Sequence, residues 1–357
     1  MSDVVDSVDT GKSKFDKEGS SGEYPILGST SVIGYDDEYD YEGDFILTAR
    51  VGANAGSLYR HAGKVKISDN TVYIQASQNI EFLYQLLIRF DIKRLSFGTG
   101  QPLVKASELK RLELMMPTDM EEQMRIGVYF KNLDHLITLH QRKYDKLTNV
   151  KKSMLEKMFP QNGSNVPEIR FKGFTEAWEQ RKLGEIGSVS MCRRIFKEQT
   201  SETGDIPFYK IGTFGADPDA FISRELFEEY KSKYPYPQKG DILISASGSI
   251  GRAVEFAGNN EYFQDSNIVW LNHDERLSNP FLKCFYSVVK WAGIEGSTIK
   301  RLYNDNILNT VICMPSVPEQ KRIGLFFENL DNLITLHQRE LEKLKNLKKA
   351  CLEKMFV

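Results

Sequence analysis

The sequence predicts an α+β fold in which two repeated domains of mixed helix and strand are joined by two long antiparallel coiled-coil helices. Three observations support this prediction. The chain repeats itself, each copy ends in a long stretch with helical periodicity, and each copy contains short apolar runs between glycine turns. The length of 357 residues suits about two domains. A repeat of this size dictates how the rest of the chain is interpreted.

The repeat divides the chain into five segments. We expect a first mixed domain over 1–117, a first long helix over 118–160, a linker over 161–167, a second mixed domain over 168–317 and a second long helix over 318–357. The linker is rich in Gln, Asn, Gly and Ser, a composition typical of a flexible connection.

The two long stretches carry the same heptad-like pattern. Both contain Asn-Leu-Asp-x-Leu-Ile-Thr-Leu-His-Gln-Arg, at Asn132–Arg142 and at Asn329–Arg339. Their apolar positions alternate in steps of four and three, which predicts a coiled coil, and about 38 residues of helix span roughly 57 Å. We expect the helix–helix seam to contain Ile126, Phe130, Leu133, Ile137, His140, Leu147, Ile323, Phe327, Leu330, Ile334, His337 and Leu344.

Polar residues interrupt this seam in equivalent places of the two copies. Lys151 and Lys348 fill the one skipped seam position in each helix. His140 and His337 are predicted to be paired polar groups that fix the register, as buried polar residues can in coiled coils. A catalytic role for these histidines is the alternative, but neither has a suitable partner nearby in the sequence.

The segments before the helices predict strands, turns and short helices. Gly43–Ala49 parallels Gly240–Ala246, each a turn followed by an apolar run with β character. Helical periodicity covers 79–90 and 280–291. The two copies differ at their starts. The second begins with a segment of about 15 residues that contains Arg170-Phe171-x-x-Phe174 and Trp178, and the first copy has no counterpart of this segment. We expect the first domain to fold less stably for this reason.

Composition excludes several function classes. The chain has 47 Lys+Arg against 49 Asp+Glu, so it lacks the strongly basic balance of many nucleic-acid-binding proteins. It contains no apolar run of the roughly 18–20 residues that a membrane span needs, and its start is not a secretory signal. The four cysteines have no C-x-x-C spacing and the five histidines no H-x-x-x-H spacing, so a zinc site is not expected. These features suit a reducing cytoplasm.

Catalytic motifs are also missing. The sequence has neither a phosphate-binding G-x-x-x-x-G-K-[ST] loop nor a G-x-S-x-G nucleophile elbow. Asn279-Pro280-Phe281 resembles part of an amino-methyltransferase signature but lacks its second proline. We therefore expect no catalytic, cofactor or metal site in this chain, and an enzyme with an unrecognised active site is the disfavoured alternative.

Candidate DNA contacts lie on turns between the predicted strands. Arg and Lys can read guanine edges, Asn and Gln adenine edges, and Ser and Thr phosphates or either base. An ordinary solvated polar loop is the alternative for any one of them. The candidates are Lys12, Thr48, Arg50, Asn54, Thr99, Gln101, Lys210, Thr213, Ser245, Ser247, Arg252, Ser297, Lys300 and Arg301.

Together these motifs resemble the specificity subunit of type I restriction-modification systems over essentially the whole chain. The resemblance rests on the helix openings Glu-Gln-x-Arg-Ile-Gly and Asn-Leu-Asp-x-Leu-Ile-Thr-Leu-His-Gln-Arg in both copies, and on Arg170-Phe171-x-x-Phe174 with Trp178. It implies that each mixed domain is a target recognition domain that reads one half of a split site in double-stranded DNA. It also implies that the two helices act as a ruler between the half-sites.

The resemblance further implies the partners. Two modification subunits would carry the adenine methylation chemistry with S-adenosylmethionine, and restriction subunits would bring ATP- and Mg-dependent translocation and cleavage. We expect Leu136, Leu139, Leu333 and Leu336 to contact partner subunits. A truncated or silent specificity subunit that acts mainly as a partner-binding scaffold is the alternative, because the first domain lacks its opening segment.

Overall fold

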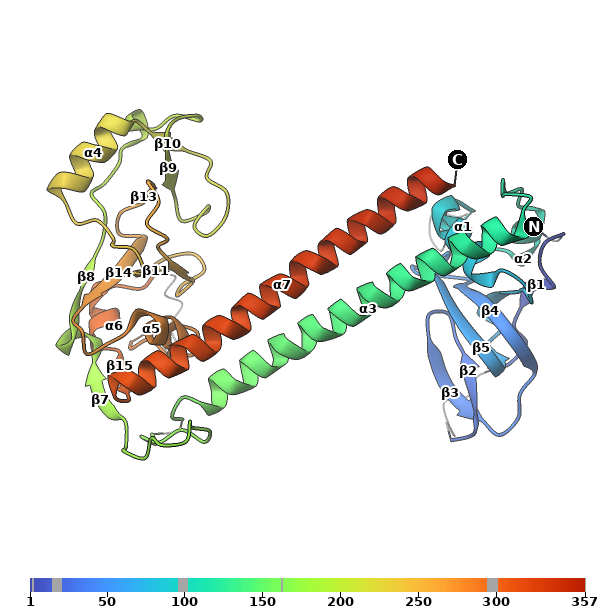
Figure 1. The fold of residues 1–357 in the computed structure, drawn as a ribbon, viewed down its shortest axis with the longest axis horizontal. Helices are drawn as coiled ribbons and strands as arrows, with labels where there is room; N and C mark the ends of the chain where they lie inside the picture. Colours follow the sequence, from blue (N-terminus) through green and yellow to red (C-terminus); the bar gives the residue numbers. More distant parts are fainter. Residues whose placement is uncertain (2, 15–20, 96–101, 162, 294–300, 357) are drawn as a thin grey trace. The chain divides into compact units, whose positions relative to one another are not determined.

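The structure is a computed structural model that describes residues 1, 3–14, 21–95, 102–161, 163–293 and 301–356. It divides into two compact units, one made of Met1–Lys143 with His337–Val357 and the other of Tyr144–Leu336. Each unit therefore contains one mixed domain and a segment of each long helix (Figure 1). This arrangement confirms the predicted α+β class with repeated domains and long helices.

The first unit is built on one six-stranded sheet with the strand order β1-β6-β4-β5-β2-β3. Its neighbours are antiparallel except β2 and β5. α1 packs the buried side chains Phe82, Leu83, Leu86 and Leu87 inward. The elements are β1 (Ser7–Thr10), β2 (Tyr24–Leu27), β3 (Val32–Asp36), β4 (Tyr41–Ala49), β5 (Leu58–Ile67), β6 (Thr71–Gln75), α1 (Ile80–Phe90), a 3₁₀ turn (Ile92–Leu95) and α2 (Ala106–Arg111).

The second unit divides its strands among three small sheets, ordered β12-β11-β14-β8, β10-β9-β13 and β15-β7. The elements are β7 (Glu179–Lys182), β8 (Gly187–Ser190), β9 (Ile206–Tyr209), β10 (Phe221–Ile222), α4 (Arg224–Lys233), β11 (Ile242–Ser245), β12 (Ala253–Glu255), β13 (Tyr262–Phe263), β14 (Ile268–His273), α5 (Asn279–Tyr286), α6 (Asn304–Asn309) and β15 (Val311–Met314), with 3₁₀ turns at Leu183–Glu185 and Lys197–Gln199.

The sequence repeat is visible in the sheets. Strands β1-β6-β4-β5 of the first unit and β8-β14-β11-β12 of the second follow the same order, and every neighbouring pair is antiparallel. The helical patches expected before the long helices are α1 and α5. Each domain therefore contains its own copy of the same four-stranded arrangement. The loops between equivalent strands can be compared directly.

The long helices are α3 (Met120–Lys157) and α7 (Val317–Met355), each within three residues of its expected bounds. No helix in the described part of the chain combines the length and apolar character needed to cross a bilayer. In the first unit the helix segments run antiparallel, since Asp134 and His140 of α3 contact Lys348 and His337 of α7. In the second unit Lys151 pairs with Asp331, and the end of α3 packs with Ile323 near the start of α7.

The expected seam residues fall into two groups. Ile126, Phe130 and Leu133 are buried, and they pack on α1 as well as on the last turns of α7. Their repeat counterparts Ile323, Phe327 and Leu330 are buried against α5 and the last turns of α3. The other group is half-buried: Ile137, His140, Leu147, Ile334, His337 and Leu344. The opening of each helix thus also anchors its own domain.

The connection between the two copies is hydrogen-bonded at its flanks. The Trp178 amide donates to the Asn165 carbonyl at 2.8 Å, and the Ile169 amide donates to the Lys157 carbonyl at 2.9 Å. Trp178 itself is buried against Phe159. These hydrogen bonds anchor both flanks of the linker, and the expected flexibility of 161–167 stays a prediction.

Candidate nucleic-acid interface

In the first unit, cationic and polar candidates gather around the loop between β5 and β6. The Arg50 amide donates to the Asn70 carbonyl at 3.0 Å, and its guanidinium donates to the Asp69 carbonyl at 3.4 Å. Lys12 is exposed next to Ser13, which forms a bridge with Ser68 in the same loop. Asn54 is exposed in the glycine turn that closes against Ala49 at the end of β4. The sheet thus brings Lys12, Arg50 and Asn54 to one end of the domain.

In the second unit, a comparable cluster surrounds the loop between β13 and β14. The Arg301 guanidinium donates to the Ser266 carbonyl at 3.1 Å, and the Ser247 hydroxyl donates to Asn267 at 2.8 Å. Ser247 also forms a β-bridge with Arg301. The exposed Arg252 donates to the Phe214 carbonyl at 2.8 Å, which joins this cluster to the turn after β9.

That turn contains the two remaining candidates of the second unit. The Thr213 hydroxyl accepts from the Lys210 amide at 3.1 Å, and the Lys210 ammonium forms an ion pair with Asp219 at 2.9 Å. Arg252 has no carboxylate partner among the described residues, whereas Lys210 has one. A cation without a neighbouring carboxylate attracts a phosphate or a base edge more strongly, because nothing nearby neutralises its charge.

Two sequence candidates are corrected by the structure. Thr48 and Ser245 are each only 1% exposed, so neither hydroxyl can reach DNA. Both lie on strands that are covered on both faces, since successive residues of β4 and of β11 face different clusters of the core. The Ser245 hydroxyl instead closes its own turn by donating to the Ser249 carbonyl and accepting from the Arg252 amide.

Four further candidates, Thr99, Gln101, Ser297 and Lys300, lie outside the described residues. Their assignment to DNA contact stays a prediction. Arg301 directly follows the undescribed residues 294–300. It is itself described and belongs to the cluster around the loop between β13 and β14.

Sequence reasoning missed one set of residues beside the second cluster. The Arg194 guanidinium pairs with Asp265 at 2.9 Å, and the Arg193 guanidinium lies over the Tyr234 ring at 5.2 Å. Phe196 is 56% exposed beside them. Together they line a shallow cleft of about 450 Å³. The adjacent arginines followed by an aromatic residue were the available signal, since stacking and cationic side chains together favour nucleic acids.

The cysteine beside these arginines is buried. Cys192 is 1% exposed, and burial raises the pKa of its thiol to about 12. A thiol that remains protonated is a poor nucleophile, so its position next to two arginines does not activate it. The described residues contain no group of three or more His, Cys, Asp or Glu that could hold a metal ion.

An acidic surface of the first unit adjoins its cationic loop. Asp36, Asp37, Glu38 and Asp40 fall at the end of β3 and in the turn before β4. A hydrogen bond from Lys66 holds the pKa of the Asp36 carboxyl below its usual value. The Asp40 carboxylate lies beside the cationic loop, because it accepts from the Ser13 hydroxyl at 2.7 Å, and it offsets part of the positive charge there.

The four leucines expected to contact partners are all exposed. Leu136 and Leu139 are 42% and 39% exposed on α3, and Leu333 and Leu336 are 44% and 51% exposed on α7. They occupy equivalent positions in the two copies of the repeat. Large apolar side chains at repeated exposed positions are typical of a docking face.

Comparisons with known proteins agree on one family. The family model for the type I restriction modification DNA specificity domain matches residues 1–149 and 175–346. A protein of Haemophilus influenzae that carries the name of a type I restriction enzyme specificity subunit is 41% identical over 325 residues, covering 88% of this chain and 83% of its own length. A specificity subunit of Methanocaldococcus jannaschii is 23% identical over 330 residues, 85% of this chain and 76% of that protein.

A solved structure has the same fold. The crystal structure of the type I restriction-modification S subunit from M. genitalium superposes with a TM-score of 0.66. The match covers 100% of this chain and 95% of that one, at 18% sequence identity. At this identity the likeness concerns the fold.

Proposed function

Because this chain belongs to the family of type I restriction-modification DNA specificity subunits, we propose that it selects the DNA sequence on which a type I complex acts. In this proposal each mixed domain is a target recognition domain that reads one half of a bipartite site. One observation carries it. Equivalent loops precede β6 in one unit and β14 in the other. The first gathers Lys12 and Arg50, and the second gathers Arg301, with Arg252 bound to the adjoining turn after β9.

These clusters are small for a DNA-binding protein. Phosphate contacts dominate affinity, and a chain with a formal charge of −2 has few cations to spare for them. We therefore infer that this subunit supplies base choice and that partner subunits supply much of the affinity. The exposed leucines Leu136, Leu139, Leu333 and Leu336 are the proposed docking face for the modification subunits, and α3 and α7 would set the spacing between the half-sites.

The chemistry would then belong to the partners. S-adenosylmethionine would act in the modification subunits, and ATP and Mg in the restriction subunits, while this chain takes no part in bond making. Its four cysteines are all free, which suits the reducing cytoplasm where such a complex would work.

Mapping of methylated sites tests this proposal. The chain is combined with its modification subunits, and methylated positions are located in DNA of random sequence. Arg50→Ala should relax bases in one half of the site and Arg252→Ala bases in the other, each at a cost of about 1–3 kcal/mol. Arg224→Ala is the matched control, because Arg224 is an exposed cation on α4 that pairs with Asp205.

Each outcome separates the proposal from its alternative. Unchanged preference in both arginine variants would show that the cationic loops do not read bases. If the complex reads a single half-site and its sequence preference does not change with Arg50→Ala, the first domain acts as a scaffold instead.

A further inference from the structure

A small cavity in the second unit is lined by aromatic residues. It lies between β9, β12, β13 and the turn after β9, and its volume is about 100 Å³. Four of its lining residues are Tyr209, Phe214, Phe256 and Phe263. The three phenylalanines are buried and the tyrosine is half-buried. Because a dry cavity of about 150 Å³ holds benzene, this one suits a smaller group.

Strand pairing places one carboxylate beside these rings. β13 runs parallel to β9, with Phe263 opposite Tyr209, and the two rings stack with centroids 5.8 Å apart. The Phe256 ring meets the Phe263 ring edge-on, also at 5.8 Å. Glu261 immediately precedes β13, and alternation along the strand directs its side chain to the same side as Phe263. Glu261 accordingly lines the cavity.

The Glu261 carboxylate has no partner. It is half-buried and forms no hydrogen bond or ion pair with any described residue. Burial raises the pKa of this carboxyl, since no cation compensates for the lost hydration. Burial and the charge of Glu261 also raise the pKa of Tyr209, so the carboxylate acts directly on that side chain.

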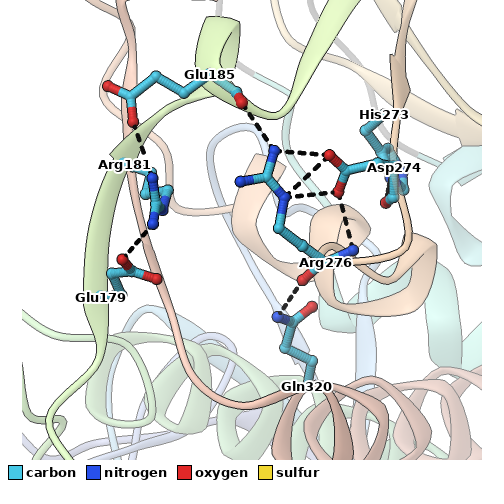
Figure 2. Close-up of polar contacts among 7 residues, drawn as sticks. All are labelled: Glu179, Arg181, Glu185, His273, Asp274, Arg276 and Gln320. Carbon is cyan, nitrogen blue, oxygen red and sulfur yellow. Dashed lines mark hydrogen bonds and ion pairs between the residues drawn. The ribbon is translucent and has the colours of Figure 1, made fainter.

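Other carboxylates of the same unit are neutralised by basic residues. Arg276 binds Asp274 through both carboxylate oxygens (Figure 2). The second acid at the cavity, Glu255, pairs with Lys283 at 3.1 Å. The described residues that line the cavity include no Lys, Arg or His. The charge of Glu261 is therefore left for a cation from outside.

The walls indicate what kind of cation fits. The faces of aromatic rings attract cations, and aromatic cages typically recognise quaternary ammonium groups. A primary ammonium has three N–H donors to satisfy, and burying unpaired donors is costly. The side chains of Leu243 and Val254, which complete the lining, offer no acceptor. A quaternary ammonium group has no N–H donor and avoids this cost.

We propose that this cavity, which we call the ammonium cavity, binds a quaternary ammonium group. Glu261 is its counter-ion, and Tyr209, Phe214, Phe256 and Phe263 are its aromatic walls. The methyl groups of the ligand would lie against the rings, and its charge would lie beside the carboxylate. The attraction is strengthened because the half-buried carboxylate is shielded from water.

Choline is the probe for this proposal. Its control is 3,3-dimethylbutan-1-ol, in which a carbon atom replaces the charged nitrogen within the same shape. Each compound is titrated into the full chain at constant chloride concentration, and binding is measured by isothermal titration calorimetry. We expect saturable binding of choline and binding of the alcohol that is at least about tenfold weaker, because the alcohol gains neither the cation–π attraction nor the ion pair.

Variants of the lining test each contribution. Glu261→Gln should weaken choline binding about tenfold and leave the alcohol unaffected, because it removes charge at nearly constant shape. Glu275→Gln is the matched control, since Glu275 is an exposed acid of the same unit that does not line the cavity. Tyr209→Phe should keep choline binding and Tyr209→Leu should weaken it, because only leucine lacks the ring.

A tripeptide with a central trimethyllysine distinguishes the two sources of such a group. Binding of the tripeptide about tenfold tighter than that of choline assigns the group to a side chain of another protein, whereas equal or weaker binding assigns it to a small molecule. The proposal is overturned if choline does not saturate, if the alcohol binds equally well, or if Glu261→Gln leaves choline binding unchanged. None of these readouts involves DNA, so failure here leaves the proposed function untouched.

Discussion

His140 of α3 and His337 of α7 face each other in the first unit, with their Nδ1 atoms 3.2 Å apart and their ring centroids 5.2 Å apart. The two residues hold the same position in the two copies of the repeat. One ring must donate and the other accept, so the pair is satisfied when at most one of them is charged. Each imidazole thus finds a polar partner at a seam position where an isolated polar group would be costly.

The first prediction concerns pH. Burial, the neighbouring His140 and Lys143 lower the pKa of His337 below its ordinary value. Above about pH 6.5 the residue is neutral in both folded and unfolded chains, so it imposes no penalty. As the pH falls below that value, the unfolded chain takes up a proton that the folded chain resists, and stability declines. The melting temperature should therefore fall less between about pH 8 and pH 5.5 in His337→Gln than in the unaltered chain.

An equal fall in both proteins would contradict this prediction. Absolute melting temperatures do not decide it, since the substitution also changes packing. Only the difference between the two pH dependences isolates the imidazole.

The second prediction concerns the lysines at the skipped seam positions. Lys348 pairs with Asp134 at 2.6 Å, and its counterpart Lys151 pairs with Asp331 at 2.5 Å. Asp134 also accepts from the buried Gln85 at 2.8 Å. Lys348→Met should cost about 1–3 kcal/mol in urea unfolding, because it leaves a half-buried carboxylate with one donor fewer.

The reversed pair is the control. Asp134→Lys and Lys348→Asp should each destabilise the protein when made singly. Combined, they should lose less stability than the two single losses added together, since the Gln85 amide can turn its oxygen toward the new ammonium. If the reversed pair is as unstable as the two single changes added together, the ion pair contributes no coupling energy.

The helices and the domain class follow from periodicity, whereas the interface does not. Four-three spacing over the repeat is a local signal, so the ends of α3 and α7 lie within three residues of the expected bounds. The convergence of Arg194 and Arg301 on the loop before β14 depends on contacts between segments far apart in sequence. No local pattern reports such contacts.

The burial of Thr48 and Ser245 has a similar cause. Alternation predicts that every second residue of a strand faces solvent, but this holds only for a sheet with one covered face. β11 is covered on both faces, with Ile242 and Ile244 in one core cluster and Leu243 in another. Whether one or both faces of a sheet are covered depends on the assembled domain, so the sequence of a single strand cannot show it.

The third prediction concerns the glycine in each Glu-Gln-x-Arg-Ile-Gly motif. A Cβ on Gly324 would lie 2.4 Å from the Cβ of Pro280, and one on Gly127 would lie 2.8 Å from the Phe82 amide nitrogen. Alanine favours a helix over glycine by about 1 kcal/mol, but the clash with α1 or α5 should outweigh that gain. We expect Gly127→Ala and Gly324→Ala to destabilise the protein by about 1–3 kcal/mol in urea unfolding.

Gly212→Ala serves as the matched control, because a Cβ there would meet no atom within 4 Å. It should leave the unfolding midpoint nearly unchanged. A helix-position alanine that stabilises the protein would mean that α1 or α5 can move away at little cost.

The last prediction concerns Arg170 and Glu319. The carboxylate is fully buried and both its oxygens accept from the guanidinium at 2.7 Å. Arg170→Ala would leave a buried charge without its partner, which typically costs about 3–5 kcal/mol. Glu319→Gln combined with Arg170→Ala should be less harmful than Arg170→Ala alone, because an uncharged amide costs less to bury. Urea unfolding of the second domain, followed through Trp178, Trp270 and Trp291, which all lie in that unit, measures both effects. A double variant no more stable than Arg170→Ala would place the loss in the packing of the arginine stem and not in the orphaned carboxylate.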